Sequence, residues 1–319
     1  MDRSTFITQL HARVELPAAA LNDLVRDATG SAIAESERIV RGDEYEVHRV
    51  VSAGGDEVFV RACFPGTEPG KAAREAEAMQ IARAAGVPVP PVLLVRTVPT
   101  DQGDRPAMVI GAAPGTQLSR LDLSDIETAT VMQDLGHLLG RLSTTRLPGP
   151  GRPDEDGRWP EPNADYQRYL RAVRADSQRL APAGITPAEV EVIARRLDEL
   201  ASVPITDQPI LSHGDIWAEH LFIDADRRIT GLIDWGMWAG GSPAEDLAAL
   251  SHRLSDAEFA IVLEHHPLGH DAALRRRIAA ASLTRSIGGL AWLVRSGQTG
   301  RECGRMVAAI RRAVADLRP

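Results

Sequence analysis

The sequence has few of the features on which several classes of protein depend. Its only two cysteines, Cys63 and Cys303, stand alone, and neither belongs to a C-x-x-C pair or a metal-binding spacing. This scarcity excludes a disulfide framework, and we expect both thiols to be reduced. No apolar run reaches the roughly 18 residues of a membrane-spanning helix, and the amino terminus lacks the apolar core of a signal peptide. We therefore expect a cytoplasmic protein without a membrane partner.

Lysine is nearly absent from the chain. Lys71 is the only lysine among 36 basic residues, so a phosphate-binding cation is expected to be an arginine. Acidic residues number 44, which gives a net charge of −8. This balance argues against nucleic acid as a partner and is compatible with a small-molecule substrate, including a cationic one drawn to an acidic cleft. It specifies no oligomeric state.

Two acidic motifs lie close together near the middle of the chain. An H-G-D motif ends at Asp215, four residues separate it from His220, and a D-W-G motif begins at Asp234. Protein kinases place H-R-D, Asn and D-F-G in a comparable order, where the first Asp accepts a hydroxyl proton and the other two residues hold metal ions beside the phosphates. Residues 221–223 and 229–233 predict a hairpin that folds the motifs toward each other. The stretch therefore indicates a phosphotransfer site.

These motifs resemble those of the aminoglycoside phosphotransferase and choline kinase-like family, which carries H-G-D-x-x-x-x-N and then I-D-W or I-D-F. Residues 241–248, G-S-P-A-E-D-L-A, are similar to the family's following G-D-P-x-x-D-L-A. The resemblance implies an α+β, two-lobed, protein-kinase-like fold, with a small antiparallel-sheet lobe and a larger, mainly helical lobe. We expect an amino-terminal nucleotide-binding lobe over residues 1–110 and a catalytic and substrate-binding lobe over residues 111–319.

His220 stands where most of the family has a metal-binding Asn. The macrolide phosphotransferases in the family resemble this chain in commonly having His there. The resemblance assigns His220 and Asp234 to the metal, which is expected to be Mg²⁺. Because imidazole binds transition-metal ions more readily than it binds Mg²⁺, Mn²⁺ is an alternative. In a second interpretation His220 only hydrogen-bonds a phosphate or water.

The first lobe is expected to open with three antiparallel strands, over residues 38–40, 45–51 and 57–63. Gly42 lies where the family places its nucleotide-covering loop, although a plain hairpin turn is an equal interpretation. The third strand, V-F-V-R, resembles the family strand whose last residue reaches the α- and β-phosphates, which assigns that role to Arg61. The alternative is that Arg61 is an exposed strand residue.

A helix over residues 71–82 is predicted from its strong helix formers, and Gly86 and Pro88 end it. Its R-E-A motif resembles the family's, which implies that Glu75 pairs with Arg61; Glu77 is the competing acid. A buried strand over residues 106–110 then leads to a hinge. In such kinases the adenine lies against the hinge backbone, here from Ile110 to Ala113, and either ATP or GTP fits this arrangement.

Helices are predicted over residues 124–142, from the Thr186 capping box to Ala201, and over residues 272–294 and 301–317. Residues 147–162 predict a loop. Acids that could hold a cationic ligand, or equally be solvated surface charges, are Glu161, Asp165, Glu264 and Asp271.

The sequence thus predicts a kinase that phosphorylates a hydroxyl of an antibiotic-like molecule, an aminoglycoside or a macrolide, and so confers resistance by modification. A metabolic kinase of an amino alcohol or sugar shares this chemistry and is the first alternative. A kinase-like nucleotide-binding protein with weak transfer activity is the second. The presence of both Asp215 and Asp234 favours an active kinase.

Overall fold

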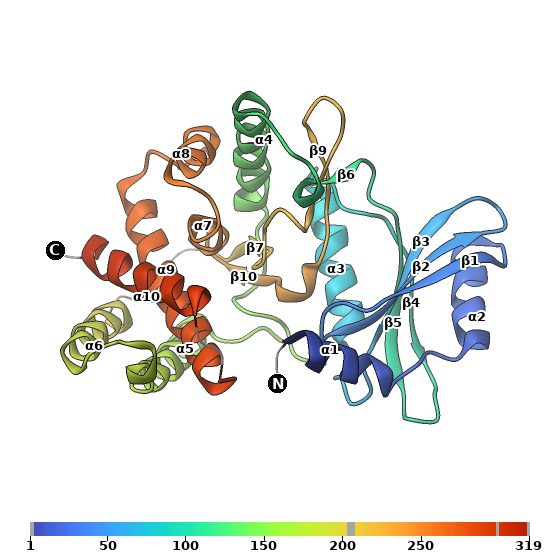
Figure 1. Ribbon diagram of the computed structural model, residues 1–319, viewed down its shortest axis with the longest axis horizontal. Helices are drawn as coiled ribbons and strands as arrows, with labels where there is room; N and C mark the ends of the chain where they lie inside the picture. Colours follow the sequence, from blue (N-terminus) through green and yellow to red (C-terminus); the bar gives the residue numbers. More distant parts are fainter. Residues whose placement is uncertain (1–2, 203–207, 298–299, 318–319) are drawn as a thin grey trace. The chain divides into compact units, whose positions relative to one another are not determined.

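A computed structural model describes residues 3–202, 208–297 and 300–317. The chain forms two compact units (Figure 1). The first comprises Met1–Arg120 and Glu219–Gly236, and the second comprises Leu121–Ala218 and Met237–Pro319. The expected boundary at residue 110 lies shortly before the end of the first of these segments, and sequence reasoning did not assign Glu219–Gly236 to the amino-terminal unit.

The first unit is built on a five-stranded sheet in which every neighbouring pair is antiparallel. The strand order is β1-β2-β3-β5-β4, formed by β1 (Ile33–Ile39), β2 (Tyr45–Ser52), β3 (Glu57–Cys63), β4 (Val92–Val98) and β5 (Arg105–Gly111). The predicted antiparallel-sheet lobe is therefore present. Strand β1 begins earlier than predicted, because it is an edge strand with mostly exposed residues and so lacks a clear apolar alternation.

Helices α2 (Ala18–Thr29) and α3 (Lys71–Ala84) cover opposite faces of this sheet. Side chains alternate between the two faces of a strand. On β3, Val58 and Val60 belong to the apolar cluster that includes Leu24 of α2. The next residue, Arg61, points to the other face, where it meets Glu75 of α3. The packing of α3 therefore sets which charges stand next to the third strand.

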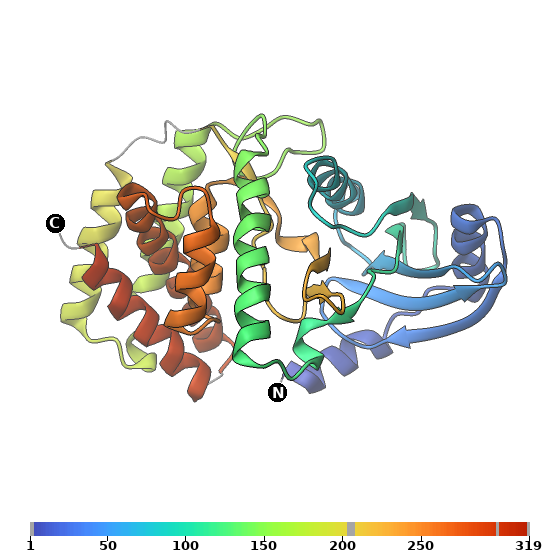
Figure 2. The same ribbon diagram turned by 90° about the horizontal axis from the view of Figure 1, so that it is seen from above.

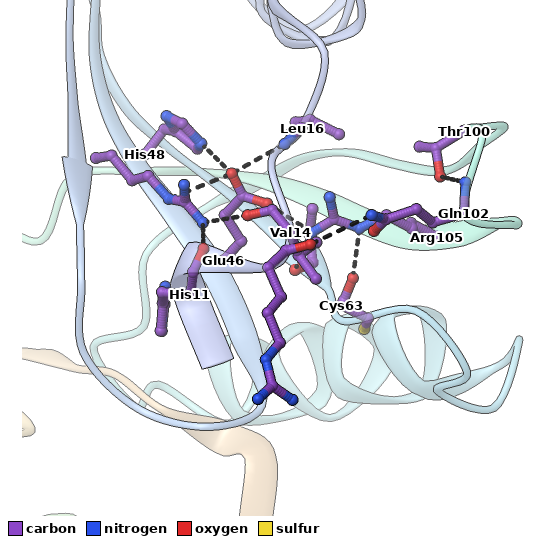
Figure 3. Close-up of polar contacts among 12 residues, drawn as sticks. His11, Val14, Leu16, Glu46, His48, Cys63, Thr100, Gln102 and Arg105 are labelled. Carbon is purple, nitrogen blue, oxygen red and sulfur yellow. Dashed lines mark hydrogen bonds and ion pairs between the residues drawn. The ribbon is translucent and has the colours of Figure 1, made fainter. Parts of the chain in front are cut away.

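A buried carboxylate joins the amino-terminal segment to the sheet. Glu46 of β2 is fully buried and accepts hydrogen bonds from the Leu16 N–H at 3.0 Å and from Arg105 Nη2 at 2.8 Å, while His48 Nε2 lies 2.9 Å away (Figure 3). Burial alone would raise the pKa of Glu46, but the hydrogen bonds from His48, Leu16 and Arg105 lower it to about 2. The carboxylate therefore stays charged and holds these groups together.

Arg38 extends the same network to helix α1 (Arg3–Ala12). Its Nε lies 3.4 Å from Glu46, and its Nη2 donates to the carbonyl oxygens of His11 at 2.8 Å and Val14 at 2.5 Å. These contacts fix the segment between α1 and α2, which ends at Pro17, the N-cap of α2.

A small three-stranded sheet completes the first unit. It has the order β6-β8-β9, formed by β6 (Thr116–Gln117), β8 (Leu221–Ile223) and β9 (Ile229–Leu232). Strands β8 and β9 are the predicted hairpin. The Leu232 N–H donates to the Pro88 carbonyl at 2.7 Å, which ties the hairpin to the segment after α3.

The second unit is mainly helical (Figure 2). Its helices are α4 (Asp125–Thr144), α5 (Pro162–Ser177), α6 (Pro187–Ala201), α7 (Pro243–Ser251), α8 (Asp256–His265), α9 (Ala272–Arg295) and α10 (Arg301–Asp316), and β7 (Ile210–Ser212) pairs with β10 (Ala239–Gly241). The short 3-10 turns are η1 (Leu118–Arg120), η2 (Ala181–Ala183) and η3 (Trp235–Met237). Helices α5, α6, α9 and α10 share one apolar core.

The helix starts that the sequence predicts are present. Ser124 and Thr186 each form a capping box with the Glu three residues later. Helices α5, α7 and α8 were not predicted. Helix α5 is polar, and α7 and α8 are too short to show a clear apolar period. In the described part of the chain, no helix is both long enough and apolar enough to cross a membrane.

Candidate active site

Arg61 is held between two carboxylates in the first unit. It is buried, contrary to the interpretation that it is an exposed strand residue. Its Nη1 donates to Glu75 Oε1, and its Nη2 donates to Asp234 Oδ1 at 3.4 Å. Glu75 is only 1% exposed, whereas Glu77 lies on the exposed face of α3. Of the two acids considered from the sequence, Glu75 is therefore the one that meets Arg61.

Tyr45 completes this cluster and was missed from the sequence. The Tyr45 hydroxyl donates to Glu75 Oε2 at 2.6 Å, and the Arg61 guanidinium stands 4.3 Å from the centre of the Tyr45 ring. Burial raises the pKa of Tyr45, and the charge of Glu75 adds to this effect. Tyr45 therefore stays protonated and remains a hydrogen-bond donor. Its position, directly after the Asp43-Glu44 pair, carries no local signal for this contact.

The charge of Arg61 is secured by its neighbours. Burial would lower the pKa of a guanidinium, but the charges of Glu75 and then Asp234 outweigh burial and raise it. The planar guanidinium of Arg61 is held on one side by the buried Glu75. A guanidinium held in this way is suited to bind a second anion through two N–H groups.

The predicted hairpin brings His220 next to Asp234. His220 Nε2 lies 3.4 Å from Asp234 Oδ2, and the Ile233 N–H donates to the His220 carbonyl at 3.0 Å. Asp234 has a φ of 63°, a left-handed conformation that costs a residue with a side chain roughly 1–2 kcal/mol. Strain of this kind often marks a functional position.

Two residues are few for a complete metal shell. Among the residues that the structure describes, no group of three or more His, Cys, Asp or Glu could hold a metal ion. Mg²⁺ is commonly bound by one or two carboxylates together with water and substrate phosphates. The exposed carboxylate of Asp234 and the imidazole of His220 therefore fit a metal whose remaining ligands come from a nucleotide and water.

Gly42 lies in the loop between β1 and β2. It has a φ of 72°, and its carbonyl oxygen lies 3.0 Å from His11 Nε2. The neighbouring Glu44 pairs with Lys71 at 3.0 Å, so the chain's one lysine is directed to this loop and not to Glu75. This pairing offsets the negative charge of Glu44 in the loop.

The expected hinge follows β5. Ile110 is the next-to-last residue of β5 and is paired on both sides, with Phe59 and Val92. The N–H groups of Gly111 and Ala112 donate to the carbonyls of Pro91 and Glu57 at 2.9 and 3.2 Å. The expectation that the whole stretch offers hydrogen-bonding groups to adenine is therefore wrong for these two N–H groups. Ala113 comes after the paired strand and is the better placed of the predicted hinge residues.

In the second unit, Asp246 shapes the H-G-D loop. Its carboxylate accepts from the N–H of His213 at 2.9 Å and from the N–H of Gly214 at 2.7 Å. Gly214 has a φ of 82°, and a Cβ there would lie 2.3 Å from the Met237 carbonyl oxygen. Only glycine fits this turn. Asp246 belongs to the G-S-P-A-E-D-L-A motif. The resemblance of this motif to the family's predicts no contact for Asp246.

Asp215 is held by two arginines that the sequence did not indicate. Its Oδ1 accepts from Arg253 Nη2 at 3.0 Å and lies 3.6 Å from Arg285 Nη2. Arg253 follows α7 and Arg285 lies on α9, so their convergence depends on how these helices pack. Asp215 belongs to the second unit, whereas Arg61, Glu75, His220 and Asp234 belong to the first.

The acids proposed for a cationic ligand have mostly local contacts. Asp271 caps α9 by accepting from the Ala273 N–H at 2.8 Å, and Glu161 precedes the first turn of α5. Glu264 is exposed and lines a groove of the second unit. The side chain of Asp165 lies outside the described part of the chain.

Solved structures of phosphotransferases have a similar fold. A thermostable mutant of aminoglycoside phosphotransferase APH(4)-Ia is 17% identical over 91% of this chain and 98% of its own, with a TM-score of 0.66. Its ternary complex with ADP and hygromycin B is 16% identical over 93% and 98%, with a TM-score of 0.65. Macrolide 2'-phosphotransferase MphH from Brachybacterium faecium is 18% identical over 94% of this chain and 97% of its own, with a TM-score of 0.57. A provisionally named fructosamine-3-kinase from Thermobifida fusca YX-ER1 is 21% identical over 96% of this chain and 100% of its own, with a TM-score of 0.64. The predicted two-lobed fold class is thus confirmed.

A curated relative and a family model complete the comparisons. The uncharacterized protein YcbJ of Bacillus subtilis (strain 168) is 36% identical over 56 residues, which span only 18% of this chain and 18% of that protein. The model of the APH phosphotransferase enzyme family matches residues 38–293. Because this match extends over most of the sequence, as the resemblance of the motifs implied, the chain belongs to the phosphotransferase enzyme family and is a small-molecule phosphotransferase.

Proposed function

We propose that this chain is a kinase that transfers the γ-phosphoryl group of ATP or GTP to a hydroxyl of a small molecule. The bond from the γ-phosphorus to the bridging β-phosphate oxygen breaks, and a bond to the acceptor oxygen forms. The hydroxyl proton passes to a base, and the products are a phosphate monoester and a nucleoside diphosphate. The contact of one buried guanidinium, Arg61, with both Glu75 and Asp234 is the observation that carries the proposal.

The nucleotide is assigned to residues of the first unit. Arg61 binds the α- and β-phosphates, and Glu75 orients its guanidinium with the help of Tyr45. The loop at Gly42 covers the phosphates, and the adenine or guanine base lies against the backbone at Ile110 and Ala113. The ADP in the ternary complex of APH(4)-Ia supports a nucleotide as the donor.

Asp234 and His220 would hold Mg²⁺, or Mn²⁺, together with the phosphates. The metal supplies positive charge that neutralises the phosphate oxygens during transfer. Asp215 accepts the proton of the attacking hydroxyl. Asp246 holds the loop of Asp215 through two backbone N–H groups, so the base is fixed before the acceptor binds.

Two classes of acceptor are candidates. An antibiotic-like acceptor is supported by the similarity to APH(4)-Ia, solved with hygromycin B, and to macrolide phosphotransferase MphH. A metabolic acceptor, a sugar or an amino alcohol, is supported by the similarity to the provisionally named fructosamine-3-kinase from Thermobifida fusca YX-ER1. Both classes use the same residues for transfer.

The test combines an acceptor panel with a variant of the base. Aminoglycosides, macrolides, sugars and amino alcohols are incubated with ATP or GTP and either metal, and the phosphate monoester is detected by mass spectrometry. Asp215→Ala should lower turnover of the best acceptor by roughly 10²- to 10⁴-fold and leave nucleotide affinity unchanged. Asp122→Ala removes an exposed acid of the same unit and should have no effect.

Two results would contradict the proposal. Transfer by Asp215→Ala at near the parental rate would show that the proton goes elsewhere. Nucleotide binding without transfer to any acceptor would favour the kinase-like nucleotide-binding protein.

A further inference from the structure

The second unit contains a groove whose wall includes both arginines that contact Asp215. The groove has a volume of about 1230 Å³ and is lined by α8, α9, α10 and the segment after α7. Apolar side chains such as Phe259 and Leu263 share its wall with Arg253 and Arg285. Pockets that bind small molecules usually combine an apolar wall with a few placed polar groups. The groove is therefore a candidate site for the acceptor, next to Asp215.

The two guanidinium groups are fixed by the H-G-D loop. Arg253 donates from Nη1 to the Ile216 carbonyl at 3.2 Å, and Arg285 donates from Nη1 to the Gly214 carbonyl at 2.9 Å. Each also places Nη2 near Asp215 Oδ1. A guanidinium has five N–H donors, more than these contacts use. A fork held in this way can bind the two oxygens of an oxyanion without first losing side-chain freedom.

Two guanidinium groups contact the one carboxylate of Asp215, and both side chains are only about one third exposed, at 34% for Arg253 and 36% for Arg285. The groove wall also carries four acids and three further arginines, namely Asp256, Glu264, Glu302, Asp316, Arg275, Arg305 and Arg312. Burial, followed by the charges of Arg285, Arg253 and Arg312, lowers the pKa of His252 to about 4, which is consistent with positive potential on this wall. The nearby carboxylate of Glu245 is engaged at the start of α7, where it accepts from the Ser242 N–H at 3.3 Å.

We propose that the acceptor carries an oxyanion, a carboxylate or a phosphate ester, close to the hydroxyl that is phosphorylated, and that Arg253 and Arg285 bind it. This inference rests on the proposed function, because it names the acceptor class of the same site. An ammonium group beside the reacting hydroxyl would meet two like charges. The acceptor is therefore a hydroxy acid, a sugar acid or a sugar phosphate, in contrast to the cationic substrate that the net charge of the chain made compatible.

The proposal is tested by binding to the full chain in the absence of nucleotide. Glucuronate, glucose 6-phosphate, glucose and glucosamine share one ring and differ in charge, and their affinities are compared by ligand-observed NMR. One of the two anionic sugars should bind about tenfold more tightly than glucose, and glucosamine should bind most weakly. The anionic sugar that binds more tightly, glucuronate or glucose 6-phosphate, shows whether the site prefers a carboxylate or a phosphate ester. Equal affinities, or a preference for glucosamine, would overturn the proposal.

Variants then show which residues cause the preference for an anionic sugar over glucose. Arg253→Gln and Arg285→Gln should each reduce it, and Arg253→Lys should retain part of it. Arg276→Gln removes the same charge from an exposed position of α9 and should leave the preference unchanged. Thermal melting separates loss of binding from loss of folding. A preference that survives both glutamine variants in a folded protein excludes these arginines.

Turnover separates this inference from the proposed function. If the arginines serve only the transferring phosphoryl group, the glutamine variants slow transfer to all acceptors alike and do not change their affinities, which would overturn the inference. If anions bind through Arg253 and Arg285 and no acceptor is phosphorylated with any nucleotide, the proposed function fails and the oxyanion site stands.

Discussion

The guanidinium of Arg61 lies 3.4 Å from the carboxylate of Asp234, although the two residues are 173 positions apart in the sequence. The contact joins the third strand of the sheet to the second residue after β9. Glu75 holds the other end of the same guanidinium. A substitution of Arg61, Glu75 or Asp234 therefore affects one cation and two carboxylates together. We expect these three side chains to be energetically coupled.

The first prediction concerns nucleotide affinity. Arg61→Ala and Glu75→Ala should each weaken binding of ATP or GTP by about tenfold or more, because each removes or misorients the charged fork. A double-mutant cycle measured by calorimetry should give a coupling of roughly 0.5–3 kcal/mol. Glu77→Ala, at an exposed position of the same helix, is the control and should have no effect. Strict additivity of the two single changes would rule out the assigned pairing.

The second prediction concerns the metal. If the His220 imidazole is a ligand, His220→Asn should shift the preference of the nucleotide-bound protein from Mn²⁺ toward Mg²⁺, because an amide oxygen is the harder donor. Metal affinity is measured by calorimetry, and Mn²⁺ binding also by electron paramagnetic resonance. An unchanged preference would mean that His220 only hydrogen-bonds a phosphate or water.

The third prediction concerns the buried network around Glu46. Glu46→Gln should destabilise the protein by roughly 3–5 kcal/mol in urea unfolding, because Arg105 and Arg38 lose a buried counter-charge. Glu57→Gln, which breaks a half-exposed pair with Arg49, should cost less than about 1 kcal/mol.

The same carboxylate gives stability a pH dependence with a definite sign. The pKa of Glu46 is lowered from 4.5 to about 2 in the folded state, so the unfolded chain takes up its proton first as the pH falls. Its contribution is present above about pH 4.5 and is lost as the pH falls toward 2. Unfolding titrations between these values should therefore show a shallower pH dependence for Glu46→Gln than for the parent. Identical slopes would contradict the assignment.

The fourth prediction concerns the turn before Asp215. Gly214→Ala and Gly184→Ala both place a side chain at a positive φ, 82° and 85°, which costs roughly 1–2 kcal/mol. Only at Gly214 does the new Cβ also meet a carbonyl oxygen, that of Met237, at 2.3 Å; at Gly184 nothing lies within 4 Å. Gly214→Ala should therefore lose more stability and, unlike Gly184→Ala, most of its turnover. Equal effects of the two changes would mean that the loop tolerates the shift.

Several features follow from the sequence alone because they depend on residues within a few positions of one another. The capping box at Thr186 forms as predicted, and Ser124 forms one as well, since the Ser or Thr and the Glu three residues later satisfy each other's backbone. The hairpin between His220 and Asp234 follows from two short apolar strands and a polar turn. The scarcity of lysine likewise predicts that the cation on the third strand is an arginine, Arg61.

Other features depended on tertiary structure, because they join segments whose distance is set by packing. Tyr45 reaches Glu75 only because α3 covers its face of the sheet, and Arg253 and Arg285 reach Asp215 only through the packing of α7 and α9. The division of the chain also places Asp215 in one unit and His220 in the other, although five positions separate them. Local pattern predicts which residues carry the chemistry, because the motifs are short, and long-range packing determines which charges surround those residues.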